Sequence, residues 1–182
     1  MVNVARKCFG AAGTTEVPME EIAAAAGIAR STLYVYFPTR ELLLQAALQS
    51  MREELDLELA VREGGEDPIE RLRGIIESLV VVVDHDAKFF RLVLAAETQA
   101  TVEGAALGAL LATIGLSVND AVTDILASGE AQGLFAPGAQ RAADLIGQQI
   151  YGALAVRSGE VALSERQAFV DRIVTFVTRA LA

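Results

Sequence analysis

The chain has 182 residues and a formal net charge of −9, and 53% of its residues are hydrophobic. This length suits one domain, or a small head joined to a larger body, and the apolar content is ample for a core. The negative charge excludes a protein that coats nucleic acid non-specifically. A single cysteine, Cys8, excludes an internal disulfide and a cysteine-based zinc site. No apolar run is long enough to span a bilayer and no secretory signal is visible, so we expect a cytoplasmic protein with no membrane partner.

Short helices with clear stop signals are predicted over the first third of the chain. The predicted helices cover residues 1–12, 19–26, 30–37 and 39–63. Gly13 ends the first of them, and Pro18 opens the second. Gly27 separates the second from the third, Pro38 stops the third, and Thr39 caps the fourth.

The rest of the chain is also predicted to be helical. The expected helices cover residues 67–83, 87–98, 103–131, 139–157 and 164–181. Asp67 and Pro68 form a strong start signal, with Glu70 three residues after the capping acid. The valine run over 80–83 favours a strand on local propensity, but there is no hairpin turn and no partner strand, so a helix is expected. The predicted fold class is all-α, with about nine helices.

Two short helices joined by a glycine turn, and braced by a helix on either side, describe a helix-turn-helix. The predicted core residues of this head are Ile22, Ala23, Ala26, Ile28, Leu33 and Phe37. The residues left on outward faces are Arg30, Ser31, Thr32, Val35 and Tyr36. Hydroxyl groups can donate to phosphate oxygens, an arginine can bind a guanine edge, and a valine can meet a thymine methyl group. Tyr34 fits either packing between helices or contact with DNA.

The stretch AGIARSTLYVYFPTRELLLQAAL resembles the signature of the tetracycline-repressor (TetR) family of bacterial regulators. MEEIAAA fits the family's first motif helix and VARKCFGAAG its opening helix, while ILASGEAQGLF and ADLIGQQIYGAL resemble two helices of its body. The resemblance implies a homodimer, with operator DNA and a small effector as its partners. It also implies a DNA-binding domain over 1–48, whose fourth helix continues to 63, and an effector-binding and dimerisation domain over 64–182.

Carried over residue by residue, the resemblance assigns DNA contacts to the third predicted helix and to the start of the fourth. The matching residues are Arg30, Ser31, Thr32, Tyr34, Tyr36 and Arg40, the last at a phosphate. Ala29 stands where the family has a serine cap, and Pro18 replaces a threonine that caps the first motif helix and touches phosphate. Met1 falls about midway along the family's first helix, and the family's customary basic arm does not appear in the sequence.

The effector pocket is expected to be mostly apolar, which favours a hydrophobic or aromatic ligand over a sugar phosphate. The candidate lining residues are His85, Phe89, Leu92, Asn119, Thr123, Gln148 and Tyr151. His85 fits a helix junction better than ligand contact, and the polar groups fit buried hydrogen bonding equally well. His85 is the only histidine, so no histidine-rich metal site is expected, and neither a metal nor another cofactor is predicted.

The last two predicted helices carry more apolar surface than one core usually absorbs. The residues expected at a dimer interface are Ile146, Ile150, Phe169, Ile173, Phe176 and Val177. Two such helices from each subunit would form a four-helix bundle with a self-complementary interface.

The leading interpretation is a DNA-binding transcriptional regulator, a homodimeric repressor released from its operator by a small hydrophobic ligand. One alternative is a ligand-binding helical dimer that has lost DNA binding. Another is a small helical enzyme, which is disfavoured because no serine, cysteine or histidine lies in a recognisable nucleophile setting.

Overall fold

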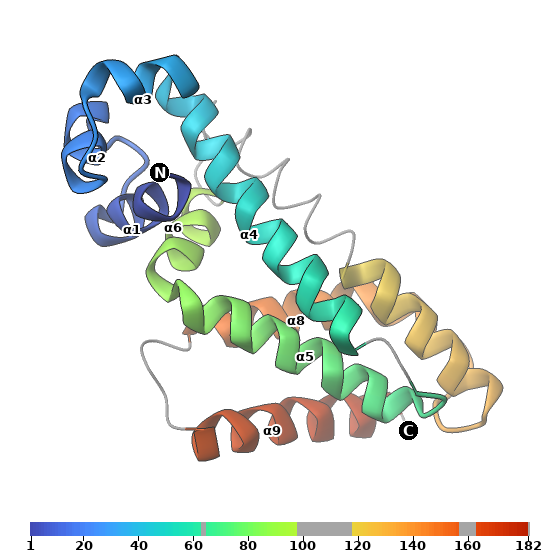
Figure 1. The fold of residues 1–182 in the computed structure, drawn as a ribbon. Helices are drawn as coiled ribbons and strands as arrows, with labels where there is room; N and C mark the ends of the chain where they lie inside the picture. The colour runs from blue at the N-terminus through green and yellow to red at the C-terminus, as the bar shows by residue number, and fades with distance from the viewer. Residues whose placement is uncertain (63–64, 98–117, 157–162, 182) are drawn as a thin grey trace. The chain divides into compact units, whose positions relative to one another are not determined.

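The computed structural model describes residues 1–62, 65–97, 118–156 and 163–181. Every regular element among these residues is helical, which confirms the all-α prediction (Figure 1). The chain divides into two compact units. The first comprises Met1–Glu54 with the segment that starts at His85, and the second comprises Leu55–Asp84 with the C-terminal segment. Among the described helices, none is both long and apolar enough to cross a bilayer.

The observed helices follow the predicted ones closely. They are α1 (Val2–Ala12), α2 (Met19–Ala25), α3 (Arg30–Tyr36), α4 (Arg40–Arg62), α5 (Pro68–His85), α6 (Ala87–Glu97), a helix over 118–131, α8 (Ala143–Val156) and α9 (Leu163–Leu181). The predicted helix over 139–157 begins instead with a separate 3-10 turn, η1 (Ala139–Ala142), which follows Gly138 in the left-handed region at φ 93°. The part of the predicted helix over 103–117 lies outside the described residues.

The valine run at the end of α5 is helical, as expected. Val80, Val82 and Val83 are buried, so their packing outweighs the modest strand preference of a β-branched residue.

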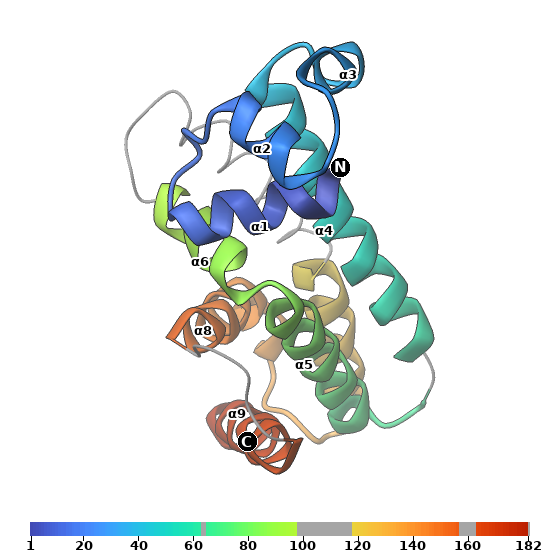
Figure 2. The ribbon, with the colours of Figure 1, turned by 60° about the vertical axis from the view of Figure 1, so that its left-hand side comes forward.

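In the first unit, α1 packs closely against α6 (Figure 2). Phe9 and Phe89 are fully buried, and their ring centroids lie 6.4 Å apart. A Cβ atom on Gly10 would lie 2.7 Å from the backbone nitrogen of Phe89. A larger residue would therefore push these two helices apart.

Arg6 of α1 lies in the interior of the same unit. Its Nη1 atom lies 2.5 Å from Glu54 of α4, and its Nε atom lies 3.2 Å from Asp86, just before α6. Its guanidinium also lies 5.9 Å from the centre of the Phe89 ring. Burial raises the pKa of Asp86, while Arg6 acts in the opposite direction. One buried cation thus ties three helical segments of the unit together.

In the second unit, α5 is joined to α9 by two ion pairs. Nε of Arg166 lies 2.8 Å from the buried carboxylate of Asp84, and Arg73 pairs with the more exposed Asp171. The hydroxyl group of Ser78 donates to the carbonyl oxygen of Gly74 at 2.9 Å or to that of Glu58 at 3.1 Å. These contacts hold α5 in place between its neighbours.

Candidate nucleic-acid interface

The turn between α2 and α3 depends on Gly27. Its φ of 67° lies in the left-handed region that glycine adopts without strain. The amide of Gly27 donates to the carbonyl of Ala24, and the amide of Ile28 donates to that of Ala23, both at 3.0 Å. These bonds close the end of α2 and redirect the chain into α3, which gives the two helices the connection of a helix-turn-helix.

The residues at the N-caps of α2, α3 and α4 are those that the sequence predicted. Ala29 and Pro18 occupy the N-cap positions of α3 and α2 without a side-chain hydrogen bond. The hydroxyl oxygen of Thr39 accepts the amide of Leu42 at 3.3 Å before α4, which confirms the predicted cap. The pKa of Glu41 is lowered by hydrogen bonds from its own backbone amide and from Thr39. An anionic carboxylate is thus favoured at this helix start.

α3 is attached by one buried side chain and is otherwise open to solvent. Leu33 is its only buried residue, and Tyr34 is half-buried. The exposed residues are Arg30, Ser31, Thr32, Val35 and Tyr36. Val35 is 78% exposed and Tyr36 is 63% exposed, which is unusual for a valine and a tyrosine on a packed helix.

The core of the head is narrower than predicted. Ile22, Ala23 and Leu33 are buried, but Ala26, Ile28 and Phe37 are only half-buried. The interior is completed instead by α1 residues and by Leu43 of α4.

Both arginines predicted to contact DNA have acidic neighbours that the sequence did not indicate. Nη2 of Arg30 lies 2.8 Å from Glu20 of α2, and its guanidinium lies 5.2 Å from the centre of the Tyr34 ring. Nη2 of Arg40 lies 3.6 Å from Glu41 and 3.9 Å from Glu16. The positive charges of Arg30 in α3 and of Arg40 in α4 are therefore partly neutralised in the free protein.

Three of the predicted pocket residues belong to the first unit. Phe89 and Leu92 are buried on α6, where Phe89 contacts Phe9 and Arg6. His85 is exposed at the end of α5. The described contacts of Phe89 are thus those of a core residue.

The other four belong to the second unit. Nδ2 of Asn119 donates to Asp144 of α8 at 3.0 Å, and the hydroxyl group of Thr123 donates to the carbonyl of Asn119 at 2.7 Å. Gln148 is exposed. Tyr151 is half-buried with an enclosed hydroxyl group, and burial raises its pKa. Asn119 and Thr123 thus already bond within the protein, and the pocket formed by these residues remains a prediction.

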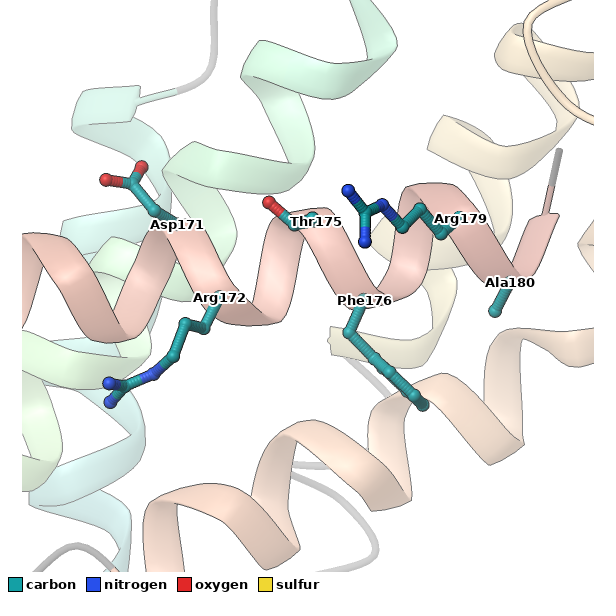
Figure 3. A pocket seen from close by; sticks show the side chains of 6 residues that line it. All are labelled: Asp171, Arg172, Thr175, Phe176, Arg179 and Ala180. Atoms are coloured by element: carbon teal, nitrogen blue, oxygen red, sulfur yellow. The ribbon is translucent and has the colours of Figure 1, made fainter.

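α9 carries two faces of different character. Its buried residues are Val170, Val174, Val177 and Leu181. On another face lies a shallow hollow of about 610 Å³, lined by Asp171, Arg172, Thr175, Phe176, Arg179 and Ala180 (Figure 3). Phe176, which is 60% exposed, extends from the same side of the helix as Arg172.

The residues predicted for the dimer interface fall into two groups. Ile146, Ile150 and Val177 are buried within the single chain. Phe169 and Ile173 are half-buried, and Phe176 is exposed. Leu145 of α8, which the sequence did not single out, is 59% exposed. Apolar periodicity alone does not distinguish a core face from a partner-facing one.

A helix-turn-helix whose second helix exposes hydroxyl groups, an arginine and a tyrosine defines a DNA-binding protein of the regulator class. Residues 2–47 match the family described as bacterial regulatory proteins, tetR family. This match confirms the resemblance to the TetR family of transcriptional regulators that the sequence motifs predicted.

Solved structures with this fold cover almost the whole chain. A bacterial regulatory protein in the tetR family from Rhodococcus RHA1 is 19% identical, with a TM-score of 0.78, and the match covers 100% of this chain and 94% of that one. The regulator PfmR from Thermus thermophilus is also 19% identical, with a TM-score of 0.73 and 96% of each chain covered. The ketosteroid transcriptional regulator KstR2 of Mycobacterium tuberculosis is 18% identical, with a TM-score of 0.70, covering 100% of this chain and 92% of that one. No curated protein sequence matches the chain. At these identities the structural likeness establishes the fold.

Proposed function

We propose that the protein is a homodimeric repressor that binds operator DNA through α3 and leaves it when a small apolar ligand binds to the body. The observation that carries the DNA-binding part is the construction of α3, with one buried leucine and a continuous exposed set of groups suited to a major groove. The proposed domains are a head over 1–48, with its fourth helix continuing to 63, and a body over 64–182.

The exposed groups of α3 divide by chemistry into backbone and base contacts. Thr32 and Tyr36 carry hydroxyl groups that donate to phosphate oxygens, and Arg40 at the start of α4 supplies a charge for another phosphate. Arg30 reads a guanine edge and Val35 meets a thymine methyl group. Two heads of a dimer would read half-sites about 34–36 Å apart, or a multiple of that distance.

The dimer is proposed to form through the exposed faces of α8 and α9. Phe169, Ile173, Phe176 and Ala180 follow one another at spacings of four, three and four, so they share one face of α9. On α8, Gly152 is exposed, and a Cβ atom there would meet nothing within 4 Å. An apolar stripe on α9 and a small exposed residue on α8 suit the close approach of helices from a second copy.

Release by a ligand requires a difference in ligand affinity between the DNA-bound and free states. A tenfold loss of DNA affinity corresponds to about 1.4 kcal/mol of coupling. By reciprocity, operator DNA weakens ligand binding by the same factor. The predicted lining residues favour an apolar or aromatic ligand.

The direct test is equilibrium binding to duplex DNA from the region upstream of the protein's own gene. We expect binding that an unlabelled copy of the same duplex competes away and that an unrelated duplex of equal length does not. Equal competition by the two duplexes would contradict the proposal. It would favour the alternative of a ligand-binding helical dimer that has lost specific DNA binding.

A further inference from the structure

Arg30 is held in a defined position before any DNA arrives. One of its terminal nitrogens, Nη2, is paired at 2.8 Å with Glu20 of the preceding helix, and its guanidinium lies 5.2 Å from the centre of the Tyr34 ring. The side chain of Arg30 is nonetheless 64% exposed. It is restrained from two directions and remains accessible.

This pairing leaves most of the guanidinium free. An arginine has five N–H donors in a planar fork, and the recorded contact with Glu20 involves a single nitrogen. The remaining donors suffice for the two acceptors of a guanine edge. Because an unrestrained arginine loses many rotamers on binding, a restrained one binds a fixed acceptor pair more selectively.

We propose that Glu20 is a specificity-determining residue that, together with the Tyr34 ring, positions Arg30 to read one base pair. The inference rests on the proposed function, in which α3 enters the major groove. Glu20 itself touches no base in this account and acts only through Arg30.

The charge of Glu20 adds a second effect, which does not depend on the DNA sequence. A carboxylate on α2 near the DNA backbone repels phosphates whatever the base sequence. Glu20 thus lowers affinity for all duplexes while it raises the discrimination made by Arg30. The repulsion leaves the ratio of specific to non-specific binding unchanged, and only the positioning of Arg30 increases that ratio.

The test compares full-length wild type with Glu20→Gln, Arg30→Ala and a control, Glu21→Gln. Glu21 is the adjacent exposed acidic residue of α2, so its replacement removes the same charge from the same helix turn. The probes are a duplex selected by wild type from a randomised pool, its single base-pair variants and an unrelated duplex. Equilibrium dissociation constants are measured for each protein on each probe.

Glu20→Gln should bind the unrelated duplex more tightly than wild type. Arg30→Ala should lose discrimination at one base pair. At that same base pair, Glu20→Gln should discriminate about two- to five-fold less than wild type, a size expected for an exposed ion pair. Glu21→Gln should tighten binding without a loss at any single base pair. Tyr34→Phe should keep the discrimination, because it keeps the ring, whereas Tyr34→Leu should lose part of it.

Unchanged discrimination in Glu20→Gln would overturn the inference, because Glu20 would then not position Arg30. Sharper discrimination would overturn it as well, because Glu20 would then compete with DNA for Arg30. Equal loss of affinity for all duplexes in Arg30→Ala would also overturn the inference. The proposed function would still stand in that case, provided that wild type binds its selected duplex specifically. If wild type selects no sequence at all, the proposed function itself fails.

Discussion

α3 and α9 both leave a face open to solvent, but only the open face of α9 includes a large aromatic side chain beside a half-buried isoleucine. α3 has seven residues and one buried side chain, Leu33, and its open face carries hydroxyl groups and an arginine. α9 has nineteen residues, and its open face includes Phe176 beside the half-buried Ile173. The first face suits phosphates and base edges, and the second suits another apolar surface. The chemistry of an exposed helical face thus indicates the kind of partner better than exposure does.

The two helices also differ in how they are held. A seven-residue helix is too short to be stable alone, so α3 depends on its packing. α9 has four buried residues among those at 165–181, and it forms ion pairs with α5. Damage to a single contact should therefore affect α3 more than α9.

The largest effect is expected from Leu33→Ala, which removes the one buried side chain of α3. A fully buried leucine replaced by alanine costs about 2–5 kcal/mol, so the free energy of unfolding and DNA binding should both fall. Urea denaturation and DNA titration measure these quantities. The control is Val35→Ala, an exposed site on the same helix, where stability should change by no more than about 0.5 kcal/mol. Equal costs for the two variants would show that α3 is not anchored through Leu33.

Arg6→Ala tests whether a buried ion pair of the first unit contributes more stability than a more exposed ion pair of the second unit. Removing Arg6 leaves the carboxylate of Asp86 largely buried without its cation, and the expected loss is about 3 kcal/mol. The matched change is Asp171→Ala, which breaks the more exposed pair with Arg73 and should cost at most about 1 kcal/mol. Thermal or urea unfolding of both variants gives the comparison. A larger loss for Asp171→Ala would reverse our ranking of the two regions.

Phe176→Glu tests the apolar face of α9. A charge placed at a packed aromatic position should weaken dimerisation by about 2 kcal/mol or more, roughly 30-fold in the dissociation constant. Ile173→Glu, at a half-buried position of the same face, should likewise yield monomers. Sedimentation equilibrium measures the dimer, and Leu57→Glu, at an exposed apolar residue of α4, serves as control. If Phe176→Glu and Leu57→Glu both sediment as dimers, the interface lies elsewhere.

The smallest effect concerns Tyr151 of α8 and appears only in alkaline solution. Burial raises the pKa of its phenol above the ordinary value of 10.0, so the folded chain keeps this proton longer than the unfolded chain. The stability from this group is fully present below pH 10.0 and is lost as the pH rises above it, by up to about 1.4 kcal/mol per pH unit. Tyr151→Phe should flatten this part of the stability profile measured by urea unfolding. Parallel profiles for the two proteins would contradict the assignment.

The head was predictable because its signals are local. Gly27 permits the left-handed turn, Pro38 cannot continue a helix, and Thr39 caps the next one, so each acts through its own backbone. The outward faces of α3 follow from helical periodicity around Leu33.

The remaining features depend on contacts between distant residues. Arg6 and Glu54 are 48 positions apart, and no pattern in either helix shows that this arginine is buried. The pairing of Arg30 with Glu20 was missed for the same reason. Periodicity marked Ile150 and Phe176 alike as apolar, but only tertiary packing determines that the first is buried within the chain and the second is exposed.

The central claim, that α3 reads DNA sequence, is tested most directly by Arg30→Ala on a selected duplex and each of its single base-pair variants. We expect Arg30→Ala to lose about 1–3 kcal/mol of discrimination between base pairs, roughly 5- to 150-fold in the ratio of dissociation constants. This loss should be confined to one base pair of each half-site. Arg141→Ala, which removes the same charge from an exposed site in the second unit, should leave that pattern unchanged. Uniform weakening of Arg30→Ala across all the duplexes would contradict the claim, because Arg30 would then contact only phosphate.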